Sequence, residues 1–284
     1  MKVLVTGAKG QLGYDVINEL TKRGHVAVGV DIDDMDITDP VSVATTIDKV
    51  HPNVVIHCAA WTAVDKAEQF PDKVYEVNAL GTKYIAEACK SVNAKMVFIS
   101  TDYVFEGVGD TPYEVTDARK GLSVYGKTKM QGEDFVMQIL DEYYIVRITW
   151  AFGVNGNNFV KTMLKLAESR KELNVVNDQI GSPTYTKDLA VLLCDMAETD
   201  KYGVYHATNE GYCSCYEFAT EIFRQAGKSV KVNPVTTDEY LKMVPQQAKR
   251  PLNSRLSKDA LDGAGLKRLP PWQDALARYL KEIL

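Results

Sequence analysis

The stretch VLVTGAKGQLG, residues 3–13, decides the fold of this chain. Its first apolar residues predict a buried strand, and the pattern over residues 11–22 predicts a helix directly afterwards. Gly7, Gly10 and Gly13 follow this strand at the spacing GxxGxxG. Glycines at this spacing let the backbone turn tightly and approach a pyrophosphate, whose negative charge the helix N-terminus favours. The stretch therefore predicts a dinucleotide-binding strand–turn–helix unit rather than a plain glycine turn.

Apolar segments further along the chain alternate with helical patterns, which is the order that builds a parallel sheet. Strands that are apolar throughout fit a sheet covered on both faces. The sequence thus predicts an α/β fold with a Rossmann-type doubly wound parallel sheet. The further strands are expected at residues 26–31, 54–60, 96–100 and 144–149, with helices over 72–91 and from 125 onward.

The pattern loosens after about residue 150, where turns such as GVNGNN and DQIGSPT separate helical stretches. We expect residues 1–150 to form an NAD(P)-binding Rossmann domain, with some later segments returning to it. Residues 151–284 are expected to form mainly a smaller C-terminal substrate-binding lobe. Ligands of open α/β sheets bind at the carboxyl ends of the strands, so the cleft between sheet and lobe is the expected site.

Composition limits the possible partners and locations. A chain of 284 residues can bury a sizeable core, and its net charge of -5 offers no broad basic surface for nucleic acid. The N-terminus lacks a basic segment followed by an apolar one, and no apolar run reaches membrane-spanning length. We expect a cytoplasmic enzyme with no membrane and no nucleic acid as partner. The cysteines are odd in number and lack CxxC spacing, which predicts reduced structural thiols: Cys58, Cys89, Cys194, Cys213 and Cys215.

Asp31 ends the second predicted strand about 20 residues after the glycine turn, where a ribose hydroxyl would meet it. A carboxylate there accepts hydrogen bonds from a 2′-hydroxyl and repels a 2′-phosphate, which favours NADH. Lys9, in the glycine turn, could offset that repulsion. The residues alone leave NADPH and NADH both open.

A possible catalytic set comes from two other segments. Thr101 follows the strand that ends at Ser100, and YGKTK places Tyr125 and Lys129 one helical turn apart. A hydroxyl, a phenol and an ammonium facing a nicotinamide would supply a carbonyl clamp, a general acid and its activator. An exposed amphipathic helix can also produce YxxxK, so the assignment depends on the glycine turn and Thr101 together.

Other polar residues have simpler explanations. His57 lies within an apolar strand and is expected to be a core histidine. The acidic stretch DIDDMDITD, residues 31–39, does not by itself offer the converging geometry that a metal needs. Asp36 and Ile37 are expected to flank the adenine instead, and we expect no metal.

The motifs together resemble the extended short-chain dehydrogenase/reductase family, whose members carry TGxxGxxG and a Ser/Thr, Tyr and Lys set. Within it the chain is similar to the reductases that act on dTDP-linked 4-keto sugars. The resemblance spans nearly the whole chain, and its most specific pair is STDYVF followed by YGKTK. The other matching segments are HCAAWTAVDKAE (57–68), VNALGT (77–82), RITWAFG (147–153), NNF (157–159), NDQIGSPT (177–184) and RPLNSRLS (250–257).

The resemblance implies hydride transfer from NADPH or NADH to C4 of dTDP-6-deoxy-L-lyxo-4-hexulose, giving dTDP-L-rhamnose for cell-surface polysaccharide. Tyr125 would protonate the C4 oxyanion, and Thr101 would hydrogen-bond the carbonyl. Lys129 would hold the nicotinamide ribose and lower the pKa of Tyr125. Asn78 would support a proton relay beside the cofactor, or would satisfy backbone groups within its helix.

The resemblance also assigns the remaining contacts. Cofactor contacts would come from the glycine turn and the end of the third strand, through Gln11, Leu12, Ala59, Ala60 and Thr62. The deoxysugar would lie against Val64, Tyr103 and Trp150, and the nucleotide diphosphate against Asn158, Lys161 and Arg250. Trp150 could instead belong to the core, and Arg250 could be a surface charge.

Two other functions fit the same fold. A nucleotide-sugar 4-epimerase would retain NAD and return the hydride, and a non-catalytic regulatory subunit would need no general acid. A homodimer is possible, because some relatives are described as dimerising around a divalent cation. The matching positions here are Asp15, Asp188 and Glu282, two of them with shorter side chains, and we do not predict that cation site.

Overall fold

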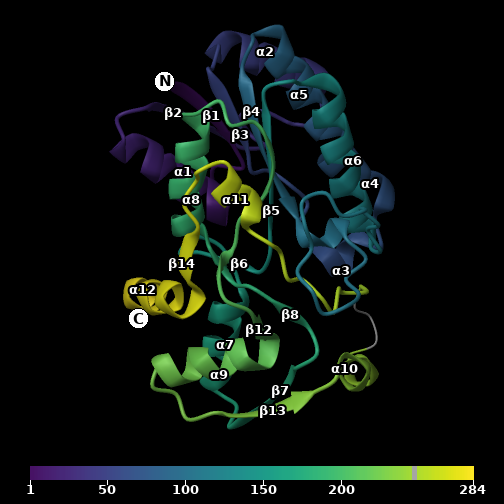
Figure 1. Ribbon diagram of the computed structural model, residues 1–284, viewed down its shortest axis with the longest axis vertical. Helices are drawn as coiled ribbons and strands as arrows, with labels where there is room; N and C mark the ends of the chain where they lie inside the picture. The colour runs from purple at the N-terminus through teal and green to yellow at the C-terminus, as the bar shows by residue number, and fades with distance from the viewer. Residues whose placement is uncertain (245–247) are drawn as a thin grey trace.

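The computed structural model describes residues 1–244 and 248–284, and it divides into a parallel sheet flanked by helices and a smaller lobe below it (Figure 1). The sheet has six strands in the order β10-β5-β4-β3-β1-β2, and every neighbouring pair is parallel. The prediction of a doubly wound α/β fold is confirmed. The strands are β1 (Lys2–Thr6), β2 (Val26–Val30), β3 (Val54–His57), β4 (Lys95–Thr101), β5 (Tyr143–Ile148) and β10 (Gly203–His206).

Helices cover both faces of the sheet, because successive strand side chains point to opposite sides. Val3 and Val5 of β1 pack on one side, against α1 (Gln11–Lys22), α8 (Thr186–Ala197) and α11 (Asp259–Gly263). Leu4 packs on the other side, against α2 (Pro40–Val50), α5 (Gly81–Ser91) and α6 (Val124–Ile139). This burial on two sides explains why the strands are apolar throughout.

The structure departs from the expected elements in four places, one of which is β3, which ends at His57 rather than at residue 60. The sheet gains its sixth strand from β10, which is only four residues long and lies in the second half of the chain. The helix expected over residues 72–91 is divided into α4 (Pro71–Tyr75), the π-helical turn η1 (Glu76–Leu80) and α5. Helix α2 was not expected, although Asp39 caps its start by accepting from the Val41 N–H and Pro40 follows as its first residue.

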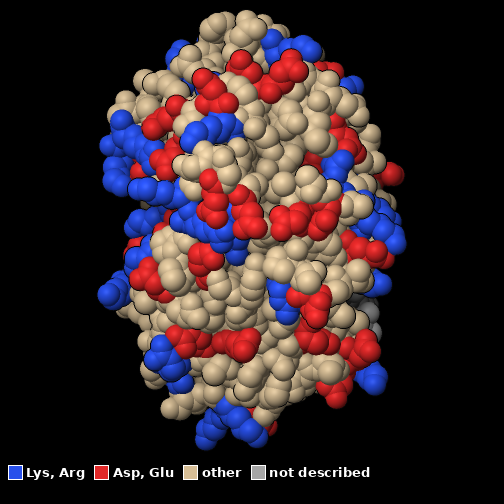
Figure 2. All heavy atoms as spheres, in the orientation of Figure 1, with Lys and Arg blue, Asp and Glu red and all other residues tan. Residues whose placement is uncertain are grey.

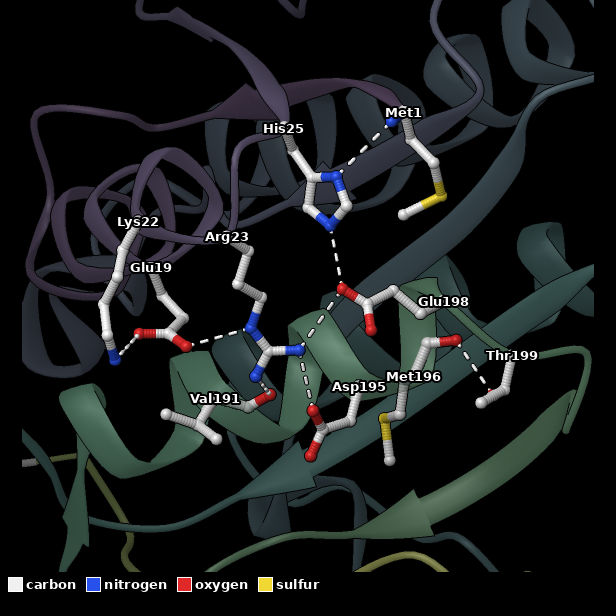
Figure 3. Close-up of polar contacts among 10 residues, drawn as sticks. All are labelled: Met1, Glu19, Lys22, Arg23, His25, Val191, Asp195, Met196, Glu198 and Thr199. Atoms are coloured by element: carbon white, nitrogen blue, oxygen red, sulfur yellow. Dashed lines mark hydrogen bonds and ion pairs between the residues drawn. The ribbon is translucent and has the colours of Figure 1, made fainter.

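A cluster of charged side chains links the C-terminal end of α1 to that of α8 (Figure 3). The cluster consists of Glu19, Arg23, His25, Asp195 and Glu198. The Arg23 guanidinium donates to Glu19 on its own helix at 2.9 Å, to Asp195 at 2.7 Å and to the Val191 carbonyl at 3.1 Å. His25 lies beside it, with Nε2 2.8 Å from a carboxylate oxygen of Glu198. The cluster therefore connects α8, from the second half of the chain, to α1, the helix that follows the glycine turn.

The lobe has its own aromatic core of Phe152, Tyr185, Phe218, Trp272 and Tyr279. Its strands pair as β7 with β13, β8 with β12, β6 with β9 and β11 with β14. The elements are β6 (Ala151–Phe152), α7 (Phe159–Ala167), β7 (Glu172–Val176), β8 (Ile180–Gly181), β9 (Thr184–Tyr185), β11 (Asn209–Glu210), β12 (Cys213–Ser214), α9 (Cys215–Gln225), β13 (Lys231–Val235), α10 (Thr237–Met243), β14 (Leu269–Pro271) and α12 (Trp272–Ile283).

Acidic and basic side chains are intermixed over the face shown in Figure 2. This distribution agrees with the small net charge of -5. Among the described residues, no helix is both long and apolar enough to cross a membrane.

Candidate active site

A cleft of about 690 Å³ opens where the carboxyl ends of the strands face the lobe. Parallel α/β sheets bind ligands at this edge. Most residues predicted for cofactor, substrate and catalysis line it. These are Gly7, Gly10, Gln11, Leu12, Gly13, Asp31, Ala59, Ala60, Thr62, Val64, Thr101, Tyr103, Tyr125, Lys129, Trp150 and Arg250.

The glycine turn leaves room for a ligand and for close packing. Gly7 has a φ of 64°, and a Cβ there would lie 2.9 Å from the backbone N and Cα of Ala59. A Cβ on Gly13 would lie 2.1 Å from the Gly7 carbonyl oxygen. Gly10 is the N-cap residue of α1 and provides no side-chain cap, and Gln11 lines the cleft in the first turn. An uncapped helix N-terminus beside a backbone with no side chains fits the pyrophosphate of a dinucleotide.

A smaller cavity of about 150 Å³ continues from the glycine turn and is lined by Asp31, Asp36 and Ile37. One Asp31 carboxylate oxygen accepts from the Lys9 backbone N–H at 3.0 Å. The Lys9 ammonium lies 3.2 Å from Asp33, and this hydrogen bond raises the pKa of Lys9. The apolar side chains of this cavity and the Asp31 carboxylate fit an adenosine. The Lys9 ammonium, which was expected to offset the charge of Asp31, pairs with Asp33 instead.

Thr101 and Tyr125 meet at the centre of the cleft. Thr101 is the last residue of β4, and Tyr125 lies in the first turn of α6, which Ser123 caps by accepting from the Gly126 N–H at 3.1 Å. Burial raises the pKa of the Tyr125 phenol, and a hydrogen bond with Thr101 partly opposes that rise. The phenol is therefore protonated at neutral pH, as a general acid must be.

Lys129 lies one turn further along α6 and is 2% exposed. Its ammonium lies 4.0 Å from the centre of the Phe98 ring. Burial lowers the pKa of Lys129 to about 7, and the Glu133 carboxylate on the next turn opposes that change. Burial is the largest effect on the Tyr125 phenol and raises its pKa, so the expectation that Lys129 lowers this pKa stays a prediction.

A second cavity of about 170 Å³ joins the cleft on the lobe side, between Tyr103, Trp150 and Arg250. Trp150 has a φ of 45°, a left-handed conformation that is strained for a large side chain and is concentrated at functional sites. Arg250 is partly buried and donates to the Asp65 carboxylate at 3.1 and 3.2 Å. Both residues line the cavity, as a pocket role requires, and Trp150 also packs against the hydrophobic core of the lobe.

Three predicted contact residues are absent from the lining of these cavities. Asn78, in η1, is buried, and its amide bonds to the backbone of Trp61 and to the Thr128 hydroxyl. Since its oxygen accepts at 2.8 Å and its nitrogen donates at 3.2 and 3.3 Å, the side chain joins the loop after β3 to α6. Asn78 thus makes its contacts within the protein, beside the helix that carries Tyr125 and Lys129.

Asn158 and Lys161 are likewise engaged within the lobe. The Asn158 amide donates to Gln11, to the Gly153 carbonyl and to the Tyr279 hydroxyl at 2.9 to 3.0 Å. The Lys161 ammonium donates to two backbone carbonyls of the loop before α7, at 2.6 and 2.8 Å. The structure does not bring either donor to the cleft, and the neighbouring residues Asn157 and Phe159 line it instead.

Several lining residues were not predicted. Asp102 and Cys58 line the cleft, and Gln179 and Ser254 line the second cavity. Asp102 directly follows Thr101 within STDYVF, and Ser254 lies within RPLNSRLS. Membership in those motifs was the signal that could have identified both residues.

The other titratable groups have structural roles. His57 is buried between the Thr6 and Thr82 hydroxyls, and burial lowers its pKa to about 3, so the prediction of a core histidine is confirmed. All five cysteines are free. Asp188 pairs with Arg278 at 2.6 Å, and Glu282 pairs with Lys187 at 2.7 Å.

Comparison with known proteins places the chain in a family. The sequence profile described as the RmlD substrate binding domain matches residues 1–284. The chain is 43% identical over 281 residues to the spore coat polysaccharide biosynthesis protein SpsK of Bacillus subtilis, covering 99% of this chain and 97% of that protein. It is 42% identical to a dTDP-4-dehydrorhamnose reductase of Aggregatibacter actinomycetemcomitans, covering 97% of each.

A solved structure agrees with this placement. The dTDP-4-dehydrorhamnose reductase of Bacillus anthracis, in complex with NADP, superimposes with a TM-score of 0.95 at 41% identity, covering 100% of this chain and 99% of that one. The match of the profile over the whole length shows that this chain belongs to the RmlD substrate binding domain family.

Proposed function

We propose that this protein is an NAD(P)H-dependent dTDP-4-dehydrorhamnose reductase, which converts dTDP-6-deoxy-L-lyxo-4-hexulose to dTDP-L-rhamnose. The observation that carries the proposal is the meeting of Thr101, Tyr125 and Lys129 with the glycine turn in one cleft. Relatives with this activity cover nearly the whole chain at 42% identity. The product is a precursor for cell-surface polysaccharide, in agreement with the name of the Bacillus subtilis relative.

The residues of the cleft divide the chemistry among them. NAD(P)H, when bound, supplies the hydride that adds to C4 of the sugar. Tyr125 donates its phenolic proton to the C4 oxygen, and the resulting phenolate regains a proton from solvent. Thr101 hydrogen-bonds the same oxygen, and Lys129 supplies a nearby ammonium for the ribose and for the transient phenolate.

The two ligands would occupy different parts of the cleft. The cofactor would extend along Gly7, Gly10 and Gly13 towards Asp31, as the uncapped start of α1 supports. NADP in the Bacillus anthracis relative supports NADPH as a substrate, and the Asp31 carboxylate supports NADH as well. On this division residues 1–150, with β10 and α8 returning, form the cofactor domain, and residues 151–284 mainly form the lobe that binds the dTDP-sugar.

The two alternatives are less well supported. A 4-epimerase must retain NAD between turnovers, whereas the relatives from Aggregatibacter actinomycetemcomitans and Bacillus anthracis are named dTDP-4-dehydrorhamnose reductases. A non-catalytic subunit has no need for a protonated tyrosine beside a threonine hydroxyl in an open cleft. A homodimer, a cytoplasmic location and the absence of nucleic-acid binding stay predictions, the first testable by analytical ultracentrifugation.

The test is a coupled assay of the purified full-length chain. dTDP-4-keto-6-deoxyglucose and the preceding 3,5-epimerase supply the substrate, and oxidation of NADPH and NADH is followed separately. We expect oxidation that depends on the epimerase and a product identified as dTDP-L-rhamnose by NMR. Retention of NAD through purification with no net oxidation would identify an epimerase instead.

A further inference from the structure

Lys129 carries its positive charge into the interior of the protein. The residue is 2% exposed, and its ammonium has no hydrogen-bond or ion-pair partner among the residues that the structure describes. Burying a charged group is costly unless another group compensates for the lost water. A different kind of interaction must therefore support this ammonium.

The Phe98 ring provides that interaction. The Lys129 Nζ atom lies 4.0 Å from the centre of the ring, and Phe98 is fully buried in β4, the strand that ends with Thr101. The face of an aromatic ring attracts a cation within about 6 Å, and the attraction is stronger where water is excluded. Gly132 on α6 leaves room for the ring, since a Cβ there would lie 3.1 Å from the Phe98 Cζ atom.

His57 fixes the Phe98 ring in turn. The two rings are stacked, with their centres 5.7 Å apart and an angle of 20° between their planes. Hydrogen bonds with the Thr6 and Thr82 hydroxyls hold the imidazole. Burial and the charge of Lys129 lower the pKa of His57 to about 3, so the imidazole is neutral near neutral pH and does not repel the ammonium.

Two other groups near Lys129 compensate less for its charge. Glu133, one turn further along α6, favours the charged form of Lys129, but its carboxylate already accepts hydrogen bonds from a serine and two arginines. Burial raises the pKa of the Cys58 thiol to about 12, so Cys58 is neutral at physiological pH. Within the described part of the chain, the contact with Phe98 is therefore the direct interaction of the ammonium.

We propose that Phe98 is a positioning residue for the reduction: the face of its ring holds the Lys129 ammonium in place and keeps it charged for the cofactor ribose and the Tyr125 phenolate. This inference rests on the proposed function, because that function assigns Lys129 to the ribose and to the phenolate. It gives an apolar core residue a part in cofactor binding.

Fluorination of the ring is the most specific test, because fluorine withdraws electrons from the face of the ring and changes its size only slightly. The full-length chain is prepared with mono-, di- and trifluorinated phenylalanine at position 98, and NADPH is titrated against each protein. We expect the Kd for NADPH to rise with each fluorine, to about tenfold for the trifluorinated protein, and the single-turnover rate of hydride transfer to fall in parallel. A Kd and a rate that do not depend on the number of fluorines would overturn the proposal.

The lysine provides a second measurement. In a Lys129→Met background no charge remains beside the ring, so fluorination of Phe98 is expected to leave the Kd for NADPH within about twofold. An equal rise in both backgrounds would overturn the proposal, since it would show that fluorine acts through packing alone.

Phe98→Leu tests the same contact with natural amino acids, and we expect it to raise the Kd for NADPH by about tenfold. Ile145→Val is the matched control, because Ile145 pairs with Phe98 across β4 and β5, is fully buried in the same core and loses a similar volume. The control is expected to leave the Kd within about twofold. An equal rise for Phe98→Leu and Ile145→Val would overturn the positioning role.

Failure of this inference can be told from failure of the proposed function. A wild-type chain that binds NADPH but does not oxidise it with the sugar nucleotide fails the proposed function, while the titrations of the fluorinated proteins still decide the inference. A wild-type reductase whose Kd for NADPH does not respond to fluorine keeps its activity and overturns the inference alone.

Discussion

Glu133 on α6 and Arg147 on β5 form a buried ion pair with two hydrogen bonds. The Arg147 guanidinium donates from Nε to one Glu133 oxygen at 2.9 Å and from Nη2 to the other at 2.8 Å, with the side chains 3% and 0% exposed. Ser100 and Arg119 donate to the same carboxylate at 2.5 and 3.0 Å. The pair thus joins α6, which carries Tyr125 and Lys129, to β5.

Breaking this pair should destabilise the protein strongly. Arg147→Met leaves the buried Glu133 carboxylate with only part of its donors, and unpairing a buried charge costs about 3–5 kcal/mol of unfolding free energy. Urea denaturation measures the loss. Lys187→Met is the control, because it breaks the exposed pair with Glu282 and should cost under about 1 kcal/mol. Equal costs for the two variants would contradict the structural role of the buried pair.

Tyr125→Phe should fold, bind NADPH normally and lose most reductase activity. Removing only the hydroxyl leaves the packing of the ring but deletes the proton donor, and general acid catalysis contributes about 10²–10⁴-fold. Single-turnover hydride transfer and a cofactor titration measure the two effects separately. Turnover near that of the wild type would rule out Tyr125 as the acid.

Asp31→Ala should shift cofactor preference towards NADPH. The change removes an acceptor for the ribose hydroxyl and a negative charge facing a 2′-phosphate, and one hydrogen bond to a charged group is worth about 1.5–3 kcal/mol. We expect the ratio of kcat/KM values for NADPH and NADH to rise about tenfold or more. Asp48→Ala, on the exposed side of α2, should leave the ratio unchanged. An unchanged ratio for Asp31→Ala would mean that the carboxylate does not face the ribose.

Trp150→Ala should raise the KM for the sugar nucleotide or lower kcat while NADPH binding stays near normal. Its ring lies against Gly181, where a Cβ would come within 3.1 Å of the indole, so the tryptophan forms a wall of the second cavity. An apolar wall of that cavity acts on the substrate alone. Loss of NADPH binding together with a large drop in melting temperature would indicate a core role instead.

Lys129 should make stability depend on pH. Its pKa falls from an ordinary value of 10.5 to about 7 in the folded protein, so the unfolded chain holds one more proton between those values. The unfolding free energy should therefore rise with pH over that window, by up to about 1.4 kcal/mol per pH unit, and fall as pH decreases towards 7. Lys129→Met removes this contribution, so the wild type should gain stability relative to the variant from pH 7 to pH 10 in urea denaturation. A constant difference would show that the ammonium is not desolvated.

The sequence by itself determined five of the six strands of the parallel sheet, the glycine turn and the presence of Thr101, Tyr125 and Lys129 in one cleft. These features depend on local spacing: apolar runs predict strands, the glycines lie three residues apart, and Tyr125 and Lys129 are one helical turn apart. Thr101 comes at the end of a strand, and strand ends in a parallel sheet meet at one edge. Residues placed by backbone periodicity were therefore found in the cleft. Figure 1 shows where β4 and α6, the elements that carry Thr101, Tyr125 and Lys129, lie in the fold.

Only the tertiary structure decided which polar side chains reach the cleft. Asn158 and Lys161 are in the expected region, but backbone carbonyls and Gln11 compete for their donors and hold them within the lobe. Ser254 meets Asp102 across 152 residues, a contact that no local pattern encodes. Burial also raised the pKa of Tyr125, since the desolvation of a side chain depends on what packs around it and not on its neighbours in sequence.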